Sequence, residues 1–213
     1  TQGYSSAASD VYKRQAWQWA WFVPHDIEGL IALMGGQEKF IGRLDSLFIA
    51  ESKIEGPLVS SDISGLIGQY AHGNEPSHHI VHLYNYVNQS WKTQQLIDTI
   101  LHTQYFNNPN GLSGNEDCGQ MSAWYVLNAM GFYQVCPGSP IYSVGRPIFD
   151  KVTINLPNGK VFEIIANNNS RTNKYIQSIR LDNILLESPF FMHSDIMKGG
   201  KIVMEMGNTP VKQ

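Results

Sequence analysis

The spacing of apolar residues changes once along this 213-residue chain, near residue 135, and this change limits the possible folds most. Before it, apolar side chains recur every three or four positions, as at Phe40 and Leu44, which is typical of amphipathic helices. After it, residues 152–156 and 161–166 form short strand-like segments around a Pro-Asn-Gly turn, which indicates a β-hairpin. The sequence therefore predicts an α+β protein: helical hairpins first, then an antiparallel β segment.

We divide the chain into three segments on this basis. Residues 1–15 are small and polar without a clear period, and we interpret them as a linker or a foreign sequence. Residues 16–135 form the helical region, and residues 136–213 form the β segment. The β segment shows no pattern of site chemistry, so we expect it to pack, with Arg146 and residues 167–169 as candidates for lining a cleft.

Periodicity and capping signals locate the individual elements. The predicted helices are residues 27–34, which Asp26 would cap, 37–50, 91–106 and 121–130. The predicted strands are residues 152–156, 161–166, 175–181 and 201–206.

Composition and charge argue against some classes of partner. The chain is 42% hydrophobic and 15% charged, and its formal net charge of −3 does not indicate a nucleic-acid or anionic-membrane partner. No apolar run approaches the roughly 18 residues of a membrane span. The two cysteines, Cys118 and Cys136, could pair in an oxidising compartment or remain small buried apolar residues.

Two adjacent carboxylates, Glu116 and Asp117, lie between glycines just before the predicted helix at 121–130. Asp117 or Asn115 could cap that helix, because a short side-chain oxygen can accept an N–H of the first turn. A carboxylate at a helix N-terminus is stabilised in its charged form. Such a group could act as a general base or bind a cation, or it could be a helix cap alone.

Three tryptophans occupy alternate positions near the start of the helical region. In an extended segment, alternate side chains lie on one face, so these residues could form a core strand or a platform on which sugars stack. Polar neighbours favour a cleft, since small-molecule sites combine apolar walls with a few polar groups. The tryptophans are Trp17, Trp19 and Trp21, and the polar neighbours are Gln18, His25 and Asp26.

A histidine-rich stretch contains Asn74, Glu75 and Pro76 at the predicted start of another helix. On that helix His78 and His82, four positions apart, would share a face. One interpretation is a metal or substrate site made by Asn74, Glu75 and a histidine. The other is a buried, hydrogen-bonded polar cluster. Zinc is disfavoured, because the His-Glu-x-x-His motif is absent and the cysteine spacing does not fit.

Five blocks of this sequence resemble signature blocks of glycoside hydrolase family 92. The two longest, His-Gly-Asn-Glu-Pro-Ser-His-His and Gly-Asn-Glu-Asp-Cys-Gly-Gln-Met-Ser-Ala-Trp, contain the histidine cluster and the paired carboxylates. The blocks are residues 72–79, 114–124, 16–18, 22–26 and 138–140. Their order and spacing also match, and the resemblance extends from Ala16 to about Asn208.

This resemblance implies an exo-acting α-mannosidase that depends on Ca²⁺ and inverts the anomeric configuration. It implies an N-terminal β-sandwich followed by an (α/α)6 toroid, of which this chain would hold the later helices and the closing β segment. The implied partners are mannose-containing glycans, with α-1,2-linked terminal mannosides of N-glycans or mannans as substrates, and the missing N-terminal portion of the same protein. A periplasmic or secreted bacterial protein is implied as well.

The resemblance also implies roles for individual residues. Asp117 matches the block that carries the general base, with Glu116 beside it. The predicted calcium ligands, all with the oxygen donors that this ion prefers, are Asn74, Glu75, Asn115 and Asp117. The predicted substrate-binding residues are Trp17, Gln18, Trp21, His25, Asp26, His72, Glu75, His78 and His79.

One departure from the family pattern concerns the general acid. Family members usually carry a glutamate before Ala-Trp-Gln, and we interpret that glutamate as the acid; here Lys13, Arg14 and Gln15 occupy these positions. We therefore expect the isolated chain to be weakly active or inactive. Two other functions stay open, a non-catalytic carbohydrate-binding module and a zinc hydrolase built on residues 72–82.

Overall fold

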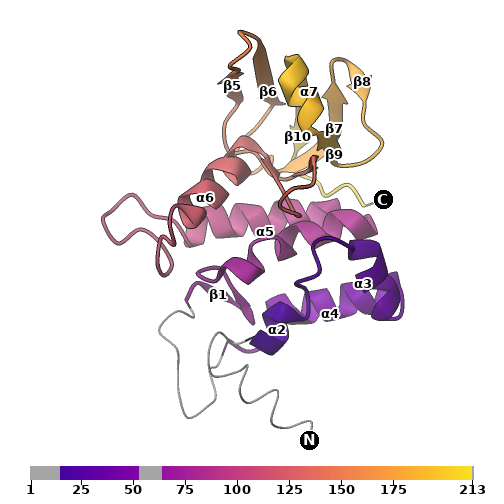
Figure 1. The fold of residues 1–213 in the computed structure, drawn as a ribbon, viewed down its shortest axis with the longest axis vertical. Helices are drawn as coiled ribbons and strands as arrows, with labels where there is room; N and C mark the ends of the chain where they lie inside the picture. Colours follow the sequence, from indigo (N-terminus) through magenta and orange to yellow (C-terminus); the bar gives the residue numbers. More distant parts are fainter. Residues whose placement is uncertain (1–14, 53–63, 213) are drawn as a thin grey trace, which may run out of the picture. The chain divides into compact units, whose positions relative to one another are not determined.

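The computed structural model describes residues 15–52 and 64–212. It divides into two compact units, of which the first contains the described residues up to Ile80 together with His102–Ser122, and the second contains the remainder. Helices come first along the chain and most strands follow (Figure 1), so the predicted α+β class is confirmed. The segment that we set apart as residues 1–15 lies outside the described residues except for Gln15.

The first unit consists of short helices and one small sheet. Its elements are α2 (Gln15–Trp19), α3 (Ile27–Leu33), α4 (Gln37–Ile49), β1 (Leu66–Ile67), β2 (Tyr70–Ala71) and the 3-10 helix η1 (Glu75–Ser77). Strands β1 and β2 pair antiparallel, with Tyr70 opposite Ile67. Tyr70 and Ala71 are both fully buried, so this short hairpin belongs to the core of the unit.

The helical hairpin α3–α4 confirms the sequence prediction. The Asp26 carboxylate accepts the Gly29 N–H at 2.8 Å, which satisfies one of the unpaired donors of the first turn of α3. Along α4 the buried side chains are Phe40, Leu44 and Leu47, at the spacing of a single helix face.

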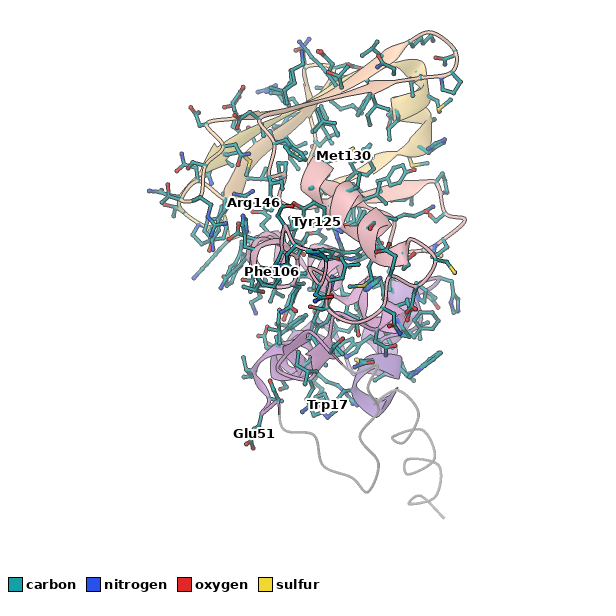
Figure 2. The ribbon with its side chains drawn as sticks, turned by 90° about the vertical axis from the view of Figure 1, so that its left-hand side faces the viewer. Trp17, Glu51, Phe106, Tyr125, Met130 and Arg146 are labelled. Atoms are coloured by element: carbon teal, nitrogen blue, oxygen red, sulfur yellow. The ribbon has the colours of Figure 1, made fainter. Side chains whose placement is uncertain are left out.

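The tryptophan segment is not a strand, so the prediction of an extended platform is wrong. It forms α2 followed by a turn, and on a helix residues two positions apart point to nearly opposite sides. Trp21 is fully buried against Phe40, with ring centroids 5.2 Å apart. Trp17 (Figure 2) and Trp19 are 40% and 45% exposed. Three alternating positions were too few to distinguish a strand from a short helix.

The histidine-rich stretch does not form the predicted α-helix either. It consists of η1 and a second 3-10 helix, η2, and Pro76 lies in the first turn of η1 as expected. In a 3-10 helix side chains three positions apart are eclipsed, so the expected shared face of His78 and His82 does not form. Asn74 occupies the N-cap position, but its side chain donates to Gln18 instead of capping the helix.

The second unit contains two sheets and most of the remaining helical residues. Three of its helices share residues with the first unit, to which Ile80, residues 102–103 and residues 120–122 belong. The elements of the second unit are η2 (Ile80–Val87), α5 (Ser90–Thr103), α6 (Gln120–Met130), β3 (Phe132–Tyr133), β4 (Ile141–Val144), β5 (Lys151–Asn155), β6 (Val161–Asn167), β7 (Tyr175–Leu181), β8 (Ile184–Leu185), β9 (Phe190–Met192), α7 (His193–Lys198) and β10 (Gly200–Gly207). The small sheet has the order β3-β4-β9, and the large sheet has the order β5-β6-β10-β7-β8.

The large sheet is mixed, which corrects the prediction of a purely antiparallel segment. Strand β10 pairs antiparallel with β7 but parallel with β6. The chain passes through α7 before β10 inserts between two strands that precede it in sequence (Figure 1). A hairpin-by-hairpin interpretation of the sequence cannot anticipate this insertion, because the pairing partner is about forty residues away in the chain.

The core of the second unit forms where alternate residues of β6 and β10 point to one face. Ile164 and Ala166 lie opposite Ile202 and Met204, and all four side chains are buried. Phe162 stacks on Phe191, with ring centroids 6.3 Å apart. These contacts join the large sheet to β9 of the small sheet.

Arg146 (Figure 2) holds α5 to the segment that follows β6, so it does not serve as the cleft residue we expected. Its Nε lies 3.1 Å from Oδ1 of Asp98 on α5, and its other nitrogens donate to the carbonyls of Pro147 and Ser170 at 2.7 and 3.0 Å. Burial lowers the pKa of Arg146, and Asp98 opposes that shift.

We expect Phe162→Ala to lower the free energy of unfolding by about 3–5 kcal/mol, because it leaves a cavity in the core of the second unit. Val161→Ala on the same strand is the matched control, since Val161 is 41% exposed whereas Phe162 is fully buried. Urea unfolding measures both. Equal losses in the two variants would contradict the assignment of the buried face of β6.

Candidate active site

Two histidine rings of the first unit, His72 and His78, form the centre of a buried hydrogen-bonded network. The ring centroids lie 5.2 Å apart. Nδ1 of His72 lies 2.9 Å from the Tyr70 hydroxyl, and its Nε2 lies 2.6 Å from the Tyr105 hydroxyl. Nε2 of His78 lies 2.9 Å from the His72 carbonyl oxygen, and its Nδ1 lies 3.1 Å from Nε2 of Gln120.

Groups that can only donate or only accept fix the direction of these bonds. Tyr105 donates its hydroxyl hydrogen to the Met121 carbonyl at 3.0 Å, so its oxygen accepts the Nε2–H of His72. The carbonyl of His72 can only accept, so His78 donates from Nε2 and its Nδ1 accepts from the Gln120 amide. His78 is therefore neutral with its proton on Nε2, and His72 also carries a proton on Nε2.

Burial favours the neutral form of these histidines. It lowers the pKa of His72 well below its ordinary value, and the neighbouring His78 acts in the same direction. Burial also lowers the pKa of His78 to about 4, although its hydrogen bond to the His72 carbonyl and the charge of Asp117 oppose the shift. His79, which donates to the Trp21 carbonyl at 2.8 Å, likewise has a pKa lowered by burial.

The loops that carry the candidate residues approach closely at two glycines. A Cβ on Gly114 would lie 3.5 Å from Cα of Gly73. A Cβ on Gly73 would lie only 2.6 Å from the Ser113 carbonyl oxygen, so a side chain there would force the loops apart. This approach brings the backbone just before Asn74 beside the backbone just before Asn115.

Glu116, and not Asp117 or Asn115 as the sequence suggested, supplies the carboxylate that caps the start of α6. Its Oε1 accepts the Ser122 N–H at 3.1 Å, and its Oε2 accepts the Ser122 hydroxyl at 3.0 Å. The difference arises because the backbone turns sharply after Glu116, where Asp117 and Cys118 have φ values of 50° and 57°. The turn carries Glu116 back over the first turn of the helix.

The Asp117 side chain is exposed on this strained turn. Asp117, Cys118 and Gly119 all have positive φ, and for the two non-glycine residues this backbone costs roughly 1–2 kcal/mol each. Local strain of this kind is found where surrounding contacts hold a segment in one conformation, often at functional sites. The turn therefore presents a carboxylate to solvent in a fixed backbone conformation.

A second polar contact joins α2 to the residue before η1. The Asn74 amide donates to Oε1 of Gln18 at 2.5 Å, and both side chains are buried. Three buried polar atoms nearby have no hydrogen-bond partner among the described residues. They are Nε2 of Gln18, Nε1 of Trp21 and Oγ of Ser77. Buried polar groups are rarely left unpaired, so water or a ligand would be expected to bind them.

The other predicted substrate residues of the first unit differ in their surroundings. His25 is exposed, and the Asp26 carboxylate is engaged in capping α3. Trp17 lies beside a cavity of about 400 Å³ that Arg43 and Ser46 also line. Glu75 is partly buried at the start of η1.

Sequence reasoning missed three members of the network, Tyr70, Tyr105 and Gln120. Tyr105 lies 33 positions from His72, and no periodic pattern connects the two residues. Gln120 directly follows the turn that carries Asp117, and this position is the only feature of the sequence that could have identified it as a member of the network.

Hydrogen bonds within the protein occupy the nitrogens of the two central histidine rings. The ring nitrogens of His72 and His78 all make hydrogen bonds within the protein, which supports the polar-cluster interpretation. In residues 15–52 and 64–212, no group of three or more His, Cys, Asp or Glu side chains is placed to hold a metal ion. A calcium site at Asn74, Glu75, Asn115 and Asp117 would therefore need amide, backbone or water oxygens in addition to carboxylates, which this hard cation accepts.

We expect the free energy of unfolding to fall as the pH falls from about 6.5 to about 4. The unfolded chain takes up protons at a histidine pKa near 6.5, whereas folded His78 does so only near 4, which corresponds to roughly 3 kcal/mol for this residue. His72 acts in the same direction. Urea unfolding across this pH range measures the effect.

His78→Gln should flatten this pH dependence, because glutamine can donate to the His72 carbonyl and does not titrate. His25→Gln is the matched control, since His25 is exposed, and it should leave the slope unchanged. A slope that His78→Gln does not alter would show that this ring is not held neutral by burial.

Comparison with known proteins gives consistent matches. A family model described as the glycosyl hydrolase family 92 catalytic domain matches residues 2–208, which include most of the segment that we set apart as linker or foreign. A family 92 α-mannosidase from Bacteroides thetaiotaomicron, solved in complex with mannoimidazole, is 42% identical with a TM-score of 0.87 and covers 92% of this chain and 26% of its own.

Two further relatives agree with this match. A family 92 inverting mannosidase from Bacteroides thetaiotaomicron VPI-5482 is 40% identical with a TM-score of 0.79, over 92% of this chain and 27% of its own. An "uncharacterized secreted glycosidase" of Arthroderma benhamiae is 28% identical over 95% of this chain and 24% of its own length. The chain thus spans about a quarter of the length of these relatives. No helix within the described ranges is both long and apolar enough to cross a membrane.

Proposed function

This chain belongs to glycoside hydrolase family 92, and from this premise we propose that it forms part of the catalytic site of an inverting, calcium-dependent exo-α-mannosidase. The proposed substrates are terminal α-mannosides, and we propose the α-1,2-linked ones of N-glycans or mannans. Because the chain spans about a quarter of its relatives, we propose that the rest of the site lies in an N-terminal portion with a β-sandwich and earlier toroid helices.

We propose Asp117 as the general base. The observation that carries this assignment is the exposed Asp117 carboxylate on a strained turn, in a loop that Gln120 ties to the neutral His78. The charge of Asp117 also acts on His78, opposing the fall in the pKa of that ring. An inverting glycosidase needs such a carboxylate to take a proton from water as the water attacks the anomeric carbon.

Glu116 is better suited to positioning than to proton transfer. Both of its carboxylate oxygens accept hydrogen bonds from Ser122, whereas a general base needs an oxygen that water can reach. We propose that Glu116 fixes the start of α6 and thereby the turn that carries Asp117. This assignment separates the two adjacent carboxylates by the hydrogen bonds of Glu116 to Ser122 and by the greater exposure of Asp117.

The polar groups beside η1 support a sugar-binding role for the same unit. Gln18, Trp21 and Ser77 have buried donors that would bind water or ligand hydroxyls. We propose Asn74, Glu75, Asn115 and Asp117 as oxygen ligands for calcium, which when bound would hold the mannose hydroxyls. His72, His78 and His79 would then support this site as neutral hydrogen-bonding groups and not as ligands to the ion.

We also propose a periplasmic or secreted location, which the name of the Arthroderma benhamiae relative supports. The competing function is a non-catalytic carbohydrate-binding module. The residues Lys13, Arg14 and Gln15 favour it, because they replace the glutamate expected before Ala-Trp-Gln.

A chimera tests the role of Asp117. Residues 16–208 of this chain replace the matching part of the Bacteroides thetaiotaomicron α-mannosidase, and turnover of α-1,2-mannobiose is measured. We expect Asp117→Asn to lower kcat by about 10²–10⁴-fold, because the water loses its proton acceptor. Glu116→Gln should lose less than about tenfold, since a glutamine oxygen can still accept the Ser122 N–H.

The matched control is Asp150→Asn, which neutralises an exposed carboxylate of the second unit and should leave kcat unchanged. NMR of the released sugar checks inversion. An active Asp117→Asn chimera, or a Glu116→Gln chimera as impaired as Asp117→Asn, would reverse the assignment of the two carboxylates.

The isolated 213-residue chain should turn over α-1,2-mannobiose weakly or not at all, because it lacks the expected acid and much of the site. The chimera, which regains both, should be active, and a calcium chelator should abolish its activity reversibly. Turnover by the isolated chain would refute the first expectation. An inactive chimera that still binds mannan would favour the carbohydrate-binding module.

A further inference from the structure

The second unit contains a cavity of about 310 Å³ that none of the predicted site residues lines. Its walls come from the start of α5, from β7 and β8 (Figure 1), and from residues 186–189. This volume lies at the lower end of the roughly 300–1,000 Å³ that is typical of small-molecule sites. The cavity therefore has room for a ligand of about the size of one monosaccharide.

Gln94 supplies a buried polar group to this cavity. Its side chain is only 5% exposed, and its Oε1 accepts the Ile176 N–H at 3.0 Å. The amide nitrogen then retains two hydrogens that can be donated to a ligand. The bond to the backbone of β7 fixes the amide, so these donors are held in one orientation before any ligand binds.

Gln177 supplies the complementary acceptor. Its Nε2 donates to the carbonyls of Tyr175 and Thr209 at 3.1 and 2.9 Å, which leaves Oε1 as an acceptor. Three serines are also among the residues that line the cavity, Ser90, Ser178 and Ser188, and a serine hydroxyl can both donate and accept.

The charge around the cavity selects the class of ligand. Glu187 lines it with an exposed carboxylate, which disfavours an anion. The Gln94 amide and the N-terminal end of α5, which begins at Ser90, both present positive dipoles that disfavour a cation. Leu185 and Pro189 give the cavity an apolar wall, which suits the C–H face of a sugar ring.

From these observations we propose that the cavity is an accessory binding site for a neutral sugar residue. It would bind the sugar without catalysing a reaction, unlike the site proposed for Asp117. The Gln94 amide and the Gln177 carbonyl bind neighbouring hydroxyl groups, and Glu187 accepts a further one. The choice of mannose as the sugar rests on the proposed function, whereas the class of ligand rests on the cavity alone.

NMR titration of the ¹⁵N-labelled 213-residue chain with methyl α-mannoside tests this site. We expect saturable shifts of the Gln94 side-chain amide and of the Ser178 and Ser188 backbone amides, with a Kd on the order of millimolar. Ser188→Trp, at an exposed position on the rim, should block the cavity and abolish these shifts. Asp117→Asn should leave them unchanged, so a failure of the catalytic proposal is distinguished from a failure of this one.

Glu187→Gln should weaken binding at least a few-fold, because a neutral amide is the poorer acceptor for a sugar hydroxyl. Its matched control is Glu38→Gln, which removes an exposed carboxylate from α4 and should have no effect. Two results would overturn the proposal: no saturable shift at Gln94 up to the solubility limit of the sugar, or equal shifts in Ser188→Trp. Stronger shifts with inorganic phosphate than with the sugar would also overturn it.

Discussion

Two buried imidazole rings must remain neutral, and the candidate site is arranged to meet that requirement. A neutral ring has one donor and one acceptor, and leaving either unpaired costs about 1–3 kcal/mol. Tyr105 and the His72 carbonyl take the two Nε2 protons, while Tyr70 and Gln120 satisfy the two Nδ1 atoms. The segments that supply these groups are β2, the residue that follows β2, the loop after α5 and the first residue of α6. Displacing any of them would break a bond in the network.

The same network explains how an unfavourable turn can persist. Positive φ at Asp117 and Cys118 costs a few kcal/mol in total. Two hydrogen bonds from Ser122 to the Glu116 carboxylate span the turn, and Gln120, just after it, contacts His78; each bond contributes roughly 1 kcal/mol. These bonds offset much of the strain and hold the backbone of the turn, which is what the proposed role of Asp117 as a fixed general base requires.

The sequence predicted those features that local physics determines. Helices α3 and α4 follow from an apolar period and from the Asp26 cap, and both depend on residues within a few positions. The parallel pairing of β10 with β6 could not be predicted in this way, since it depends on where a distant segment inserts.

The errors at the site have similar causes. The cap of α6 comes from Glu116 and not from Asp117 because of backbone angles that no sequence period records. The prediction of an extended tryptophan segment was wrong because three alternating positions fit both a strand and a short helix followed by a turn. The blocks that resemble family 92 nevertheless located the carboxylate turn and the histidine cluster, and the structure brings parts of these two blocks into contact at Gln120 and His78.

The most direct measurement is a crystal structure of the chimera with calcium and mannoimidazole bound. The account predicts an Asp117 carboxylate oxygen within hydrogen-bonding distance of a water molecule beside the anomeric carbon, with Glu116 still bonded to Ser122. An Asp117 side chain turned away from the sugar, or a Glu116 carboxylate in its place, would contradict the account.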